Sequence, residues 1–136
     1  MIEQPTSYDP GELLDAARRA RRHAYAPYSG FPVGAALLDD AGRIHHGVNV
    51  ENASYGLTTC AERSAVSCAV SSGSRSFRAL AVIGPRDDEP CMPCGGCRQI
   101  LFEFSPDLEV VLAAPGGGAR VVPLNELLPQ AFRLGA

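Results

Sequence analysis

Residues 78–113, RALAVIGPRDDEPCMPCGGCRQILFEFSPDLEVVLA, decide the fold of this chain. The apolar runs 78–84 and 108–113 are short enough to be buried strands. Between them, a helix is predicted from Pro93 to about residue 104, and it begins in a CxxC sequence. A strand, a helix and a strand in this order predict a right-handed parallel crossover, so part of the sheet is parallel.

The flanking segments predict the rest of the sheet and its helices. We expect strands at 33–38, 44–50 and 119–122, and helices from Pro10 to Pro27, from about 60 to 70 with Thr58 or Thr59 as cap, and from 123 to about 132. The glycines at 116–118 leave too short a connection for a parallel crossover, so the last two strands are predicted to be antiparallel. The predicted fold class is α/β, a three-layer α/β/α sandwich with a mixed five-stranded sheet.

Size and charge limit the functions that the chain can have. Its 136 residues, 46% of them hydrophobic, predict a single domain, 1–136. A net charge of -3 gives no electrostatic footprint for nucleic acid or for a membrane, so the expected partner is a small molecule. The one basic run, at 18–22, is predicted to be a solvated helix face.

Cellular location follows from what the sequence lacks and from its cysteines. No apolar stretch is long enough to span a membrane, and residues 1–4 do not begin a signal peptide. Five cysteines, an odd number in a chain with an ordinary core, favour metal ligation in a reducing compartment over disulfides. We therefore expect a cytoplasmic protein.

Three cysteines and one acid form the candidate reactive site. Cys94 and Cys97 are three residues apart at a helix start, and Cys60 opens another helix with Glu62 in its first turn. Soft thiolate ligands favour zinc, and helix N-termini favour the thiolate form. Three protein ligands leave a tetrahedral zinc one position short, as in catalytic sites, and Glu62 is then the candidate proton shuttle.

Other interpretations remain open from spacing alone. Cys91 could complete a closed four-thiolate structural site with Cys60, Cys94 and Cys97, or the four could hold an iron–sulfur cluster, and CxxC also occurs in redox pairs. The remaining cysteine, Cys68, is predicted to lie in the core. The three histidines, His23, His45 and His46, lack partners at ligand spacing and are predicted to be structural.

The negative charge of a three-thiolate zinc site suggests a role for Arg63. Three thiolates on a divalent zinc leave a net charge of minus one, which makes a bound water harder to ionise. Arg63 follows Glu62 directly and can reach the thiolate sulfurs, although an ordinary exposed helix arginine is the alternative.

The chain resembles the small homotetrameric cytidine deaminases. The matching blocks are 26–29 (APYS), 31–37 (FPVGAAL), 49–53 (NVENA), 60–63 (CAER), 93–99 (PCGGCRQ) and 126–129 (ELLP). The resemblance implies the cytidine deaminase-like fold, a homotetramer, and one zinc per chain held by Cys60, Cys94 and Cys97. It also implies hydrolysis of cytidine and deoxycytidine to uridine and deoxyuridine plus ammonia, a reaction of pyrimidine salvage. A zinc-bound hydroxide would attack C4 while Glu62 shuttles the proton.

The same resemblance assigns the nucleoside contacts. It implies that Asn49 and Glu51, one residue apart on a strand, hold the ribose hydroxyls, and that Phe31 packs on the base. Ala61, through its backbone, would read the pyrimidine edge together with Glu62. Phe132 resembles the C-terminal aromatic that reaches the site of a neighbouring subunit. Phe31 and Phe132 could equally be core residues.

Three other functions are compatible with parts of the sequence. A deaminase of the blasticidin type shares the cysteine motifs, but the Asn49 to Asn52 block favours a nucleoside enzyme. A deaminase of polynucleotides usually has histidine as its first ligand and needs a basic groove, which this chain lacks. The third is a non-catalytic zinc or redox module that uses CxxC for folding. The sequence does not rank cytidine against deoxycytidine.

Overall fold

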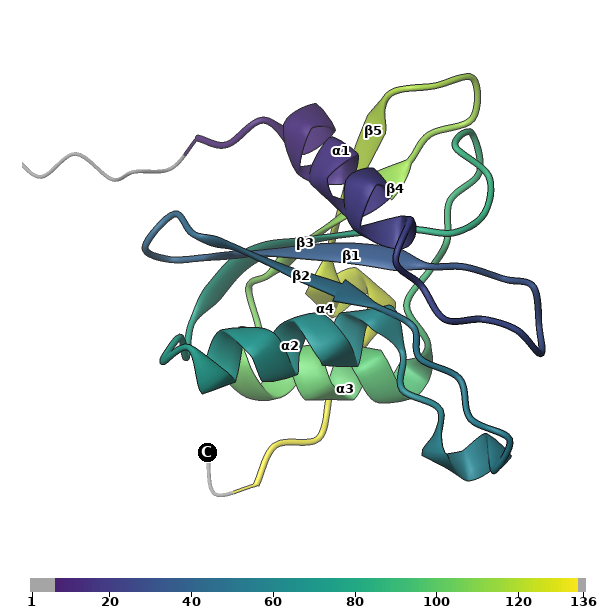
Figure 1. The fold of residues 1–136 in the computed structure, drawn as a ribbon. Helices are drawn as coiled ribbons and strands as arrows, with labels where there is room; N and C mark the ends of the chain where they lie inside the picture. Colours follow the sequence, from purple (N-terminus) through teal and green to yellow (C-terminus); the bar gives the residue numbers. More distant parts are fainter. Residues whose placement is uncertain (1–6, 135–136) are drawn as a thin grey trace, which may run out of the picture.

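The structure, a computed structural model, describes residues 7–134 and contains one five-stranded sheet in the order β2-β1-β3-β4-β5 (Figure 1). The N-terminal residues 1–4, considered above for a signal peptide, lie outside this range. The strands are β1 (Gly34–Asp39), β2 (Ile44–Val48), β3 (Phe77–Ile83), β4 (Glu109–Ala113) and β5 (Ala119–Pro123). The helices are α1 (Pro10–Arg21), a 3-10 turn η1 (Tyr55–Leu57), α2 (Ala61–Ser71), α3 (Gly95–Phe104) and α4 (Leu124–Leu127).

The mixed sheet confirms the predicted topology. β3 and β4 are parallel and are joined through α3, which is the crossover that residues 78–113 predict. β1 pairs antiparallel with both β2 and β3, and β5 pairs antiparallel with β4. α1 lies on one face of the sheet and α2, α3 and α4 on the other, so the three layers are also as predicted (Figure 1).

Two glycines let the helices approach the sheet closely. A Cβ at Gly34 would lie 2.1 Å from the Ala17 carbonyl oxygen in α1, and a Cβ at Gly47 would lie 2.3 Å from the Ala61 carbonyl oxygen in α2. Both distances are far shorter than an ordinary contact, so the two helices pack directly on the strand backbones at these positions. Gly47 thereby fixes the height of the α2 N-terminus above the sheet.

Helix ends differ from the prediction in four places, one of which is the start of α3 at Gly95 and not at Pro93. α1 begins as expected, with the Asp9 carboxylate accepting from the Gly11 amide at 2.9 Å, but it ends at Arg21 and not at Pro27. α4 ends at Leu127, because Leu128 precedes Pro129 and a residue before proline avoids the helical region. The N-cap of α2 is Cys60 and not Thr58 or Thr59, and its side chain makes no capping hydrogen bond.

Two residues of the edge strand β2, one polar and one a glycine, face α2. His45 and Gly47 are buried, whereas Ile44 and His46 are exposed on the opposite face. Within residues 7–134, no helix is both long enough and apolar enough to cross a membrane.

A buried polar cluster ties the β1–β2 hairpin to the end of α2. The Asp39 carboxylate accepts from the Ser74 hydroxyl at 2.6 Å and lies 2.9 Å from His45 Nε2. Burial acts to raise the pKa of Asp39, but hydrogen bonds from Ser74, His45 and two backbone amides outweigh it and hold the pKa well below its usual range. The structural role predicted for His45 is confirmed.

Candidate metal centre and active site

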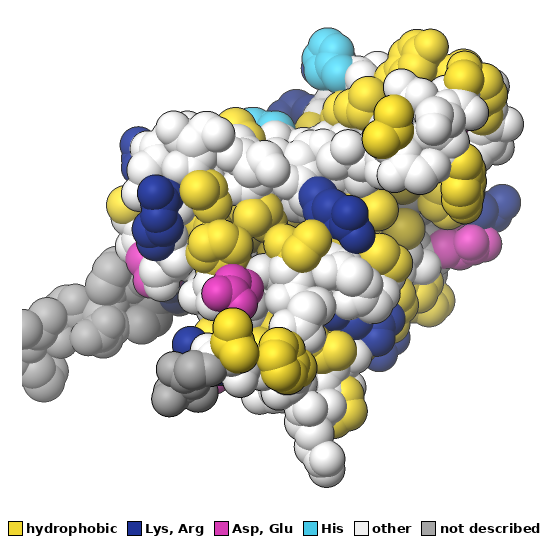
Figure 2. Space-filling model, turned by 90° about the horizontal axis from the view of Figure 1, so that it is seen from below, with side chains coloured by type: hydrophobic (Ala, Val, Ile, Leu, Met, Phe, Trp, Pro, Cys, Tyr) yellow, Lys and Arg dark blue, Asp and Glu magenta, His cyan; other side chains and the backbone are white. Residues whose placement is uncertain are grey.

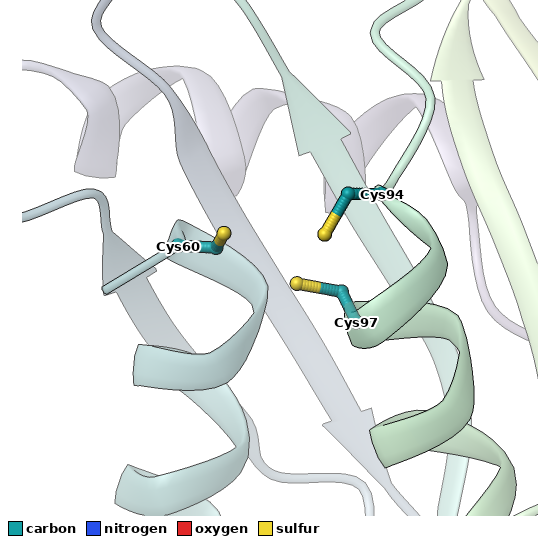
Figure 3. A group of neighbouring side chains, drawn as sticks. All are labelled: Cys60, Cys94 and Cys97. Carbon is teal, nitrogen blue, oxygen red and sulfur yellow. The ribbon is translucent and has the colours of Figure 1, made fainter. Parts of the chain in front are cut away.

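The thiols of Cys60, Cys94 and Cys97 meet at the N-termini of α2 and α3. Cys60 caps α2, Cys94 caps α3, and Cys97 lies in the first turn of α3, with the three sulfur atoms pointing toward one another (Figure 3). All three sulfurs lie within 4.8 Å of one another. A tetrahedral zinc with bonds of about 2.3 Å places its sulfurs about 3.8 Å apart, so small rotations of these side chains suffice to hold the ion.

Electrostatics at the cluster favour a cation. Burial, together with the nearby Glu62 charge, raises the pKa of Cys97, and burial also raises that of Cys60. Burial acts to raise the pKa of Cys94 too, but hydrogen bonds from Cys97 and Cys60 hold it below its usual range. Several acidic groups thus crowd into one place, which is costly unless a metal neutralises them.

Glu62 is the acid of this cluster. It lies in the first turn of α2 and is only 6% exposed. Besides burial, its negative charge acts to raise the pKa of the Cys60, Cys94 and Cys97 thiols. Burial raises the pKa of Glu62, while the positive charge of Arg63 acts in the opposite direction. A buried carboxylate beside a metal site, with no structural ion pair of its own among residues 7–134, is available for proton transfer.

Arg63 contacts the metal ligands directly. Its guanidinium donates a hydrogen bond to the Cys97 sulfur, an interaction that raises the pKa of Arg63. The side chain passes over Gly96, where a Cβ would lie 2.8 Å from Arg63 Nη2. Its Nε is buried and has no hydrogen-bond partner among the described residues. The side chain is therefore an arginine held at the thiols, and not an ordinary exposed helix arginine.

The other cysteines do not join the cluster. Among the residues described, Cys60 shares a possible metal site only with Cys94 and Cys97. Cys91 is not part of this group. Cys91 instead lies beside Gly84, in the loop that precedes α3, and burial raises its pKa to about 11. Cys68 is exposed on α2, so the prediction of a core cysteine is wrong.

Asn49 and Glu51 hold the loop that carries Phe31. The Asn49 amide is 9% exposed; its Oδ1 accepts from the Val33 amide and its Nδ2 donates to the Phe31 carbonyl, both at 2.9 Å. Glu51 Oε1 accepts from the amides of Tyr28 and Ser29 at 2.9 and 3.1 Å. Neither residue lies in β2, which ends at Val48, contrary to the expected strand position. The motif spacing did not indicate this structural task.

Two cavities flank this loop. The larger one, about 470 Å³, is lined by Tyr28, Ser29, Glu51, Asn52, Tyr55, Thr58 and Cys60. The smaller one, about 170 Å³, includes Phe31 and Cys91. Apart from Glu51 and Cys60, the residues that line the larger cavity were not predicted as site residues, although most of them lie in or beside the blocks at 26–29 and 49–53.

The remaining predicted site residues lie in different surroundings. Ala61 is fully buried at the start of α2. Phe132 is 69% exposed beyond α4, where its carbonyl oxygen accepts from Gln99 Nε2 at 3.0 Å. Phe132 is therefore not a core residue of this chain, and its ring is free to contact another molecule.

Three protein ligands leave one zinc position open, and a buried acid lies next to the site. This arrangement is typical of catalytic zinc, whereas structural zinc has four protein ligands. The class of protein defined by this fold and site is thus a zinc-dependent hydrolase.

Comparison with known proteins gives the family. Residues 8–114 match the family model described as the cytidine and deoxycytidylate deaminase zinc-binding region, and the chain belongs to this family. It is 47% identical over 125 residues to a cytidine deaminase of Sporosarcina psychrophila, covering 91% of both chains.

Solved structures agree with the sequence relatives. A cytidine deaminase structure from Burkholderia pseudomallei superimposes with a TM-score of 0.82 at 52% identity, covering 89% of this chain and 97% of that one. The cytidine deaminase of Mycobacterium tuberculosis gives a TM-score of 0.84 at 43% identity, covering 94% and 100%. The predicted fold, the zinc-binding region and the deaminase family are thereby confirmed.

Proposed function

We propose that this chain hydrolyses cytidine and deoxycytidine to uridine and deoxyuridine, releasing ammonia. The observation that carries the proposal is the buried Glu62 beside three converging thiols, with Cys60 also lining the larger cavity that contains Glu51. That cavity has the volume of a small-molecule site. The relatives named cytidine deaminase, 43 to 52% identical in sequence, support the same substrate class.

In this proposal the metal is held by Cys60, Cys94 and Cys97, one zinc per chain. When bound, zinc supplies Lewis-acid activation of water for attack on C4 of the cytosine ring. Glu62 would accept the first proton that the water gives up and deliver it to ring N3. It would then take the proton of the hydroxyl added at C4 and pass it to the amino group, which leaves as ammonia while the C4 carbonyl forms. One carboxyl group serves as base and then as acid, because each proton that it accepts is one that it returns.

Arg63 is proposed to balance the charge of the ligands. Three thiolates and a divalent ion carry a net charge of minus one, and the guanidinium at the Cys97 sulfur restores neutrality. The N-termini of α2 and α3 contribute further positive potential at the same place.

The nucleoside contacts follow from the cavity. Glu51 faces the larger cavity and is proposed to accept hydrogen bonds from ribose hydroxyls, with Asn49 positioning the loop and adding a contact. Phe31 is proposed to pack on the base and the Ala61 backbone to read its edge. Hydrogen bonds from Ser29 and Tyr28 lower the pKa of Glu51 and so favour its carboxylate form, which only accepts hydrogen bonds.

The decisive experiment compares Glu62→Gln with Glu103→Gln, an acid exposed on α3. Loss of ultraviolet absorbance is followed with cytidine, deoxycytidine, cytosine and blasticidin S, and zinc per chain is measured in parallel. We expect Glu62→Gln to keep its zinc and fold but to lose activity at least a hundredfold, on the order expected for general acid–base catalysis, and Glu103→Gln to match the wild type. Full activity in Glu62→Gln would overturn the mechanism, and activity on blasticidin S alone would overturn the substrate class.

We also propose that the chain works as a homotetramer. Hydrophobic side chains gather on the side of the molecule where α2 and α3 lie, seen in Figure 2. Tyr55 in η1 is 90% exposed, and Leu57, Phe132 and Leu134 are also exposed. Aromatic and aliphatic side chains this exposed favour burial against another copy, which would bring Phe132 to a neighbouring site.

Light scattering during gel filtration tests the assembly. We expect a mass near four chains for the wild type and a smaller mass for Tyr55→Glu, because a charge at the contact opposes its burial. A monomeric wild type would contradict the tetramer without affecting the assignment of Glu62.

The thiolate ligands also favour a reducing compartment, such as the cytoplasm.

A further inference from the structure

The edge strand β2 has one face that α1 covers only in part. His45 and Gly47 face α2, so Ile44, His46 and Val48 face the side of the sheet on which α1 lies. α1 packs mainly over β1 and β3 and ends at Arg21, before it reaches the outer side of β2. Ile44 consequently remains 42% exposed.

A cavity of about 420 Å³ occupies this gap. It is lined by Arg19, Ala20, Arg22, His23, His46, Gly47 and Val48. Small-molecule sites have volumes of about 300 to 1,000 Å³, so the cavity is large enough for a ligand. It is separate from the metal centre, which lies on the other face of the sheet at the start of α2.

The charges around this cavity are all of one sign. Of the four arginines at 18–22, Arg18 and Arg21 form ion pairs with Asp87 at 3.2 and 2.9 Å. Arg19 and Arg22 form no ion pair with any acid among residues 7–134 and both line the cavity. The prediction that the arginines at 18–22 form a solvated helix face is thus correct only for Arg19 and Arg22.

The α1 C-terminus does not account for this arrangement. Basic residues in a last helical turn offset the partial negative charge of the helix end, which explains Arg18, Arg19 and Arg21. It does not explain why His46, on a strand, faces the same cavity, or why no acid lines it. Arg22 uses Nε to contact the Arg19 carbonyl at 3.2 Å, which leaves its terminal nitrogens for a ligand.

We propose that this cavity binds a small phosphate-bearing molecule. Two guanidinium groups without acid partners supply the forked donors that match phosphate oxygens. The two histidine rings add donors, while Ala20 and Val48 supply an apolar wall for the rest of the ligand. A chain with net charge -3 has little general attraction for anions, so binding here depends on this local cluster.

Titration of the isotope-labelled, zinc-loaded protein with inorganic phosphate tests the proposal. Amide chemical shifts are followed in nuclear magnetic resonance spectra, with sodium chloride of equal ionic strength as the reference titration. We expect saturable shifts at Ala20, Gly47 and Val48, and an apparent dissociation constant raised roughly tenfold or more in Arg22→Gln, because a charged hydrogen bond is lost. Arg120→Gln removes the same charge from exposed β5 at the opposite edge of the sheet and should bind phosphate like the wild type.

Three results would overturn the proposal. They are a response to phosphate no larger than that to sodium chloride, an equal weakening by Arg22→Gln and Arg120→Gln, and a change of oligomeric mass in Arg22→Gln without loss of phosphate binding. The last result would identify this face as a contact between copies of the chain. Because binding is measured and not catalysis, each outcome is independent of the proposed deaminase activity.

Discussion

Replacement of Gly47 by alanine should damage both stability and the metal centre. The new Cβ would lie 2.3 Å from the Ala61 carbonyl oxygen and 2.4 Å from the Ala65 amide nitrogen, where an ordinary contact is at least 3.4 Å. β2 and α2 must therefore separate by about 1 Å, and since both obstacles are backbone atoms, no side-chain rotation relieves the clash. We expect a loss of about 3 kcal/mol, the upper end for overpacking.

Urea unfolding of the zinc-loaded protein measures this loss. With an m-value near 2 kcal/mol per molar, the midpoint should fall by about 1.5 M. Because the separation displaces the N-terminus of α2, which carries Cys60 and Glu62, the folded variant should also hold zinc more weakly.

Two other glycines serve as matched controls. Gly34→Ala places a Cβ 2.1 Å from the Ala17 carbonyl oxygen in α1, so it should destabilise the fold similarly while leaving zinc affinity unchanged. Gly56→Ala meets no heavy atom within 4 Å and should be near neutral. If Gly47→Ala unfolded at the same midpoint as Gly56→Ala and bound zinc as tightly, the argument from close helix–strand packing would be refuted.

Three further predictions concern single side chains. The folded pKa of Asp39 is depressed, so its stabilising effect is present above the unfolded pKa of about 3.9 and is lost as pH falls below that value. Asp39→Asn should therefore flatten the acid limb of a stability–pH curve. It should also lower the free energy of unfolding at pH 7 by about 2 kcal/mol, measured by urea unfolding. Cys91→Ala should retain one zinc per chain by metal analysis, whereas Cys94→Ala should not; loss of zinc from both would revive the four-thiolate site. Arg63→Ala should weaken zinc binding about 10- to 100-fold in chelator competition, and an unchanged affinity would remove its proposed role.

The sheet was predictable because its strands are continuous apolar runs with short, recognisable connections. The crossover through α3 and the antiparallel β5 both follow from local sequence and connection length. The C-terminal end of α1 was less predictable. α1 stops at Arg21, where its arginines meet Asp87 in a distant loop, and no local breaker marks that position.

The ligand set was predictable but its surroundings were not. Spacing made Cys60, Cys94 and Cys97 candidate ligands because each lies at a predicted helix start, but it left Cys91 open as a fourth, and the set of three came from the family resemblance. The exposure of Cys68 could not be predicted. Its neighbours Ala65 and Ala69 are buried, and helical periodicity alone did not decide whether Cys68 lies on the buried or the exposed face of α2. The bonds from Asn49 to the loop at 31–33 join segments 16 to 18 residues apart, and no local pattern encodes them.

The size of residue 96 is linked to the charge of the metal centre. Arg63 reaches the Cys97 sulfur by crossing the space above Gly96, where a Cβ would come within 2.8 Å of Nη2. Even alanine therefore pushes the guanidinium outward by several tenths of an ångström, and a longer side chain excludes it from that space. Because Coulomb attraction weakens with distance, a larger residue 96 leaves the three thiolates less well compensated. A glycine between two metal ligands thus affects how closely the balancing charge approaches the three thiolates.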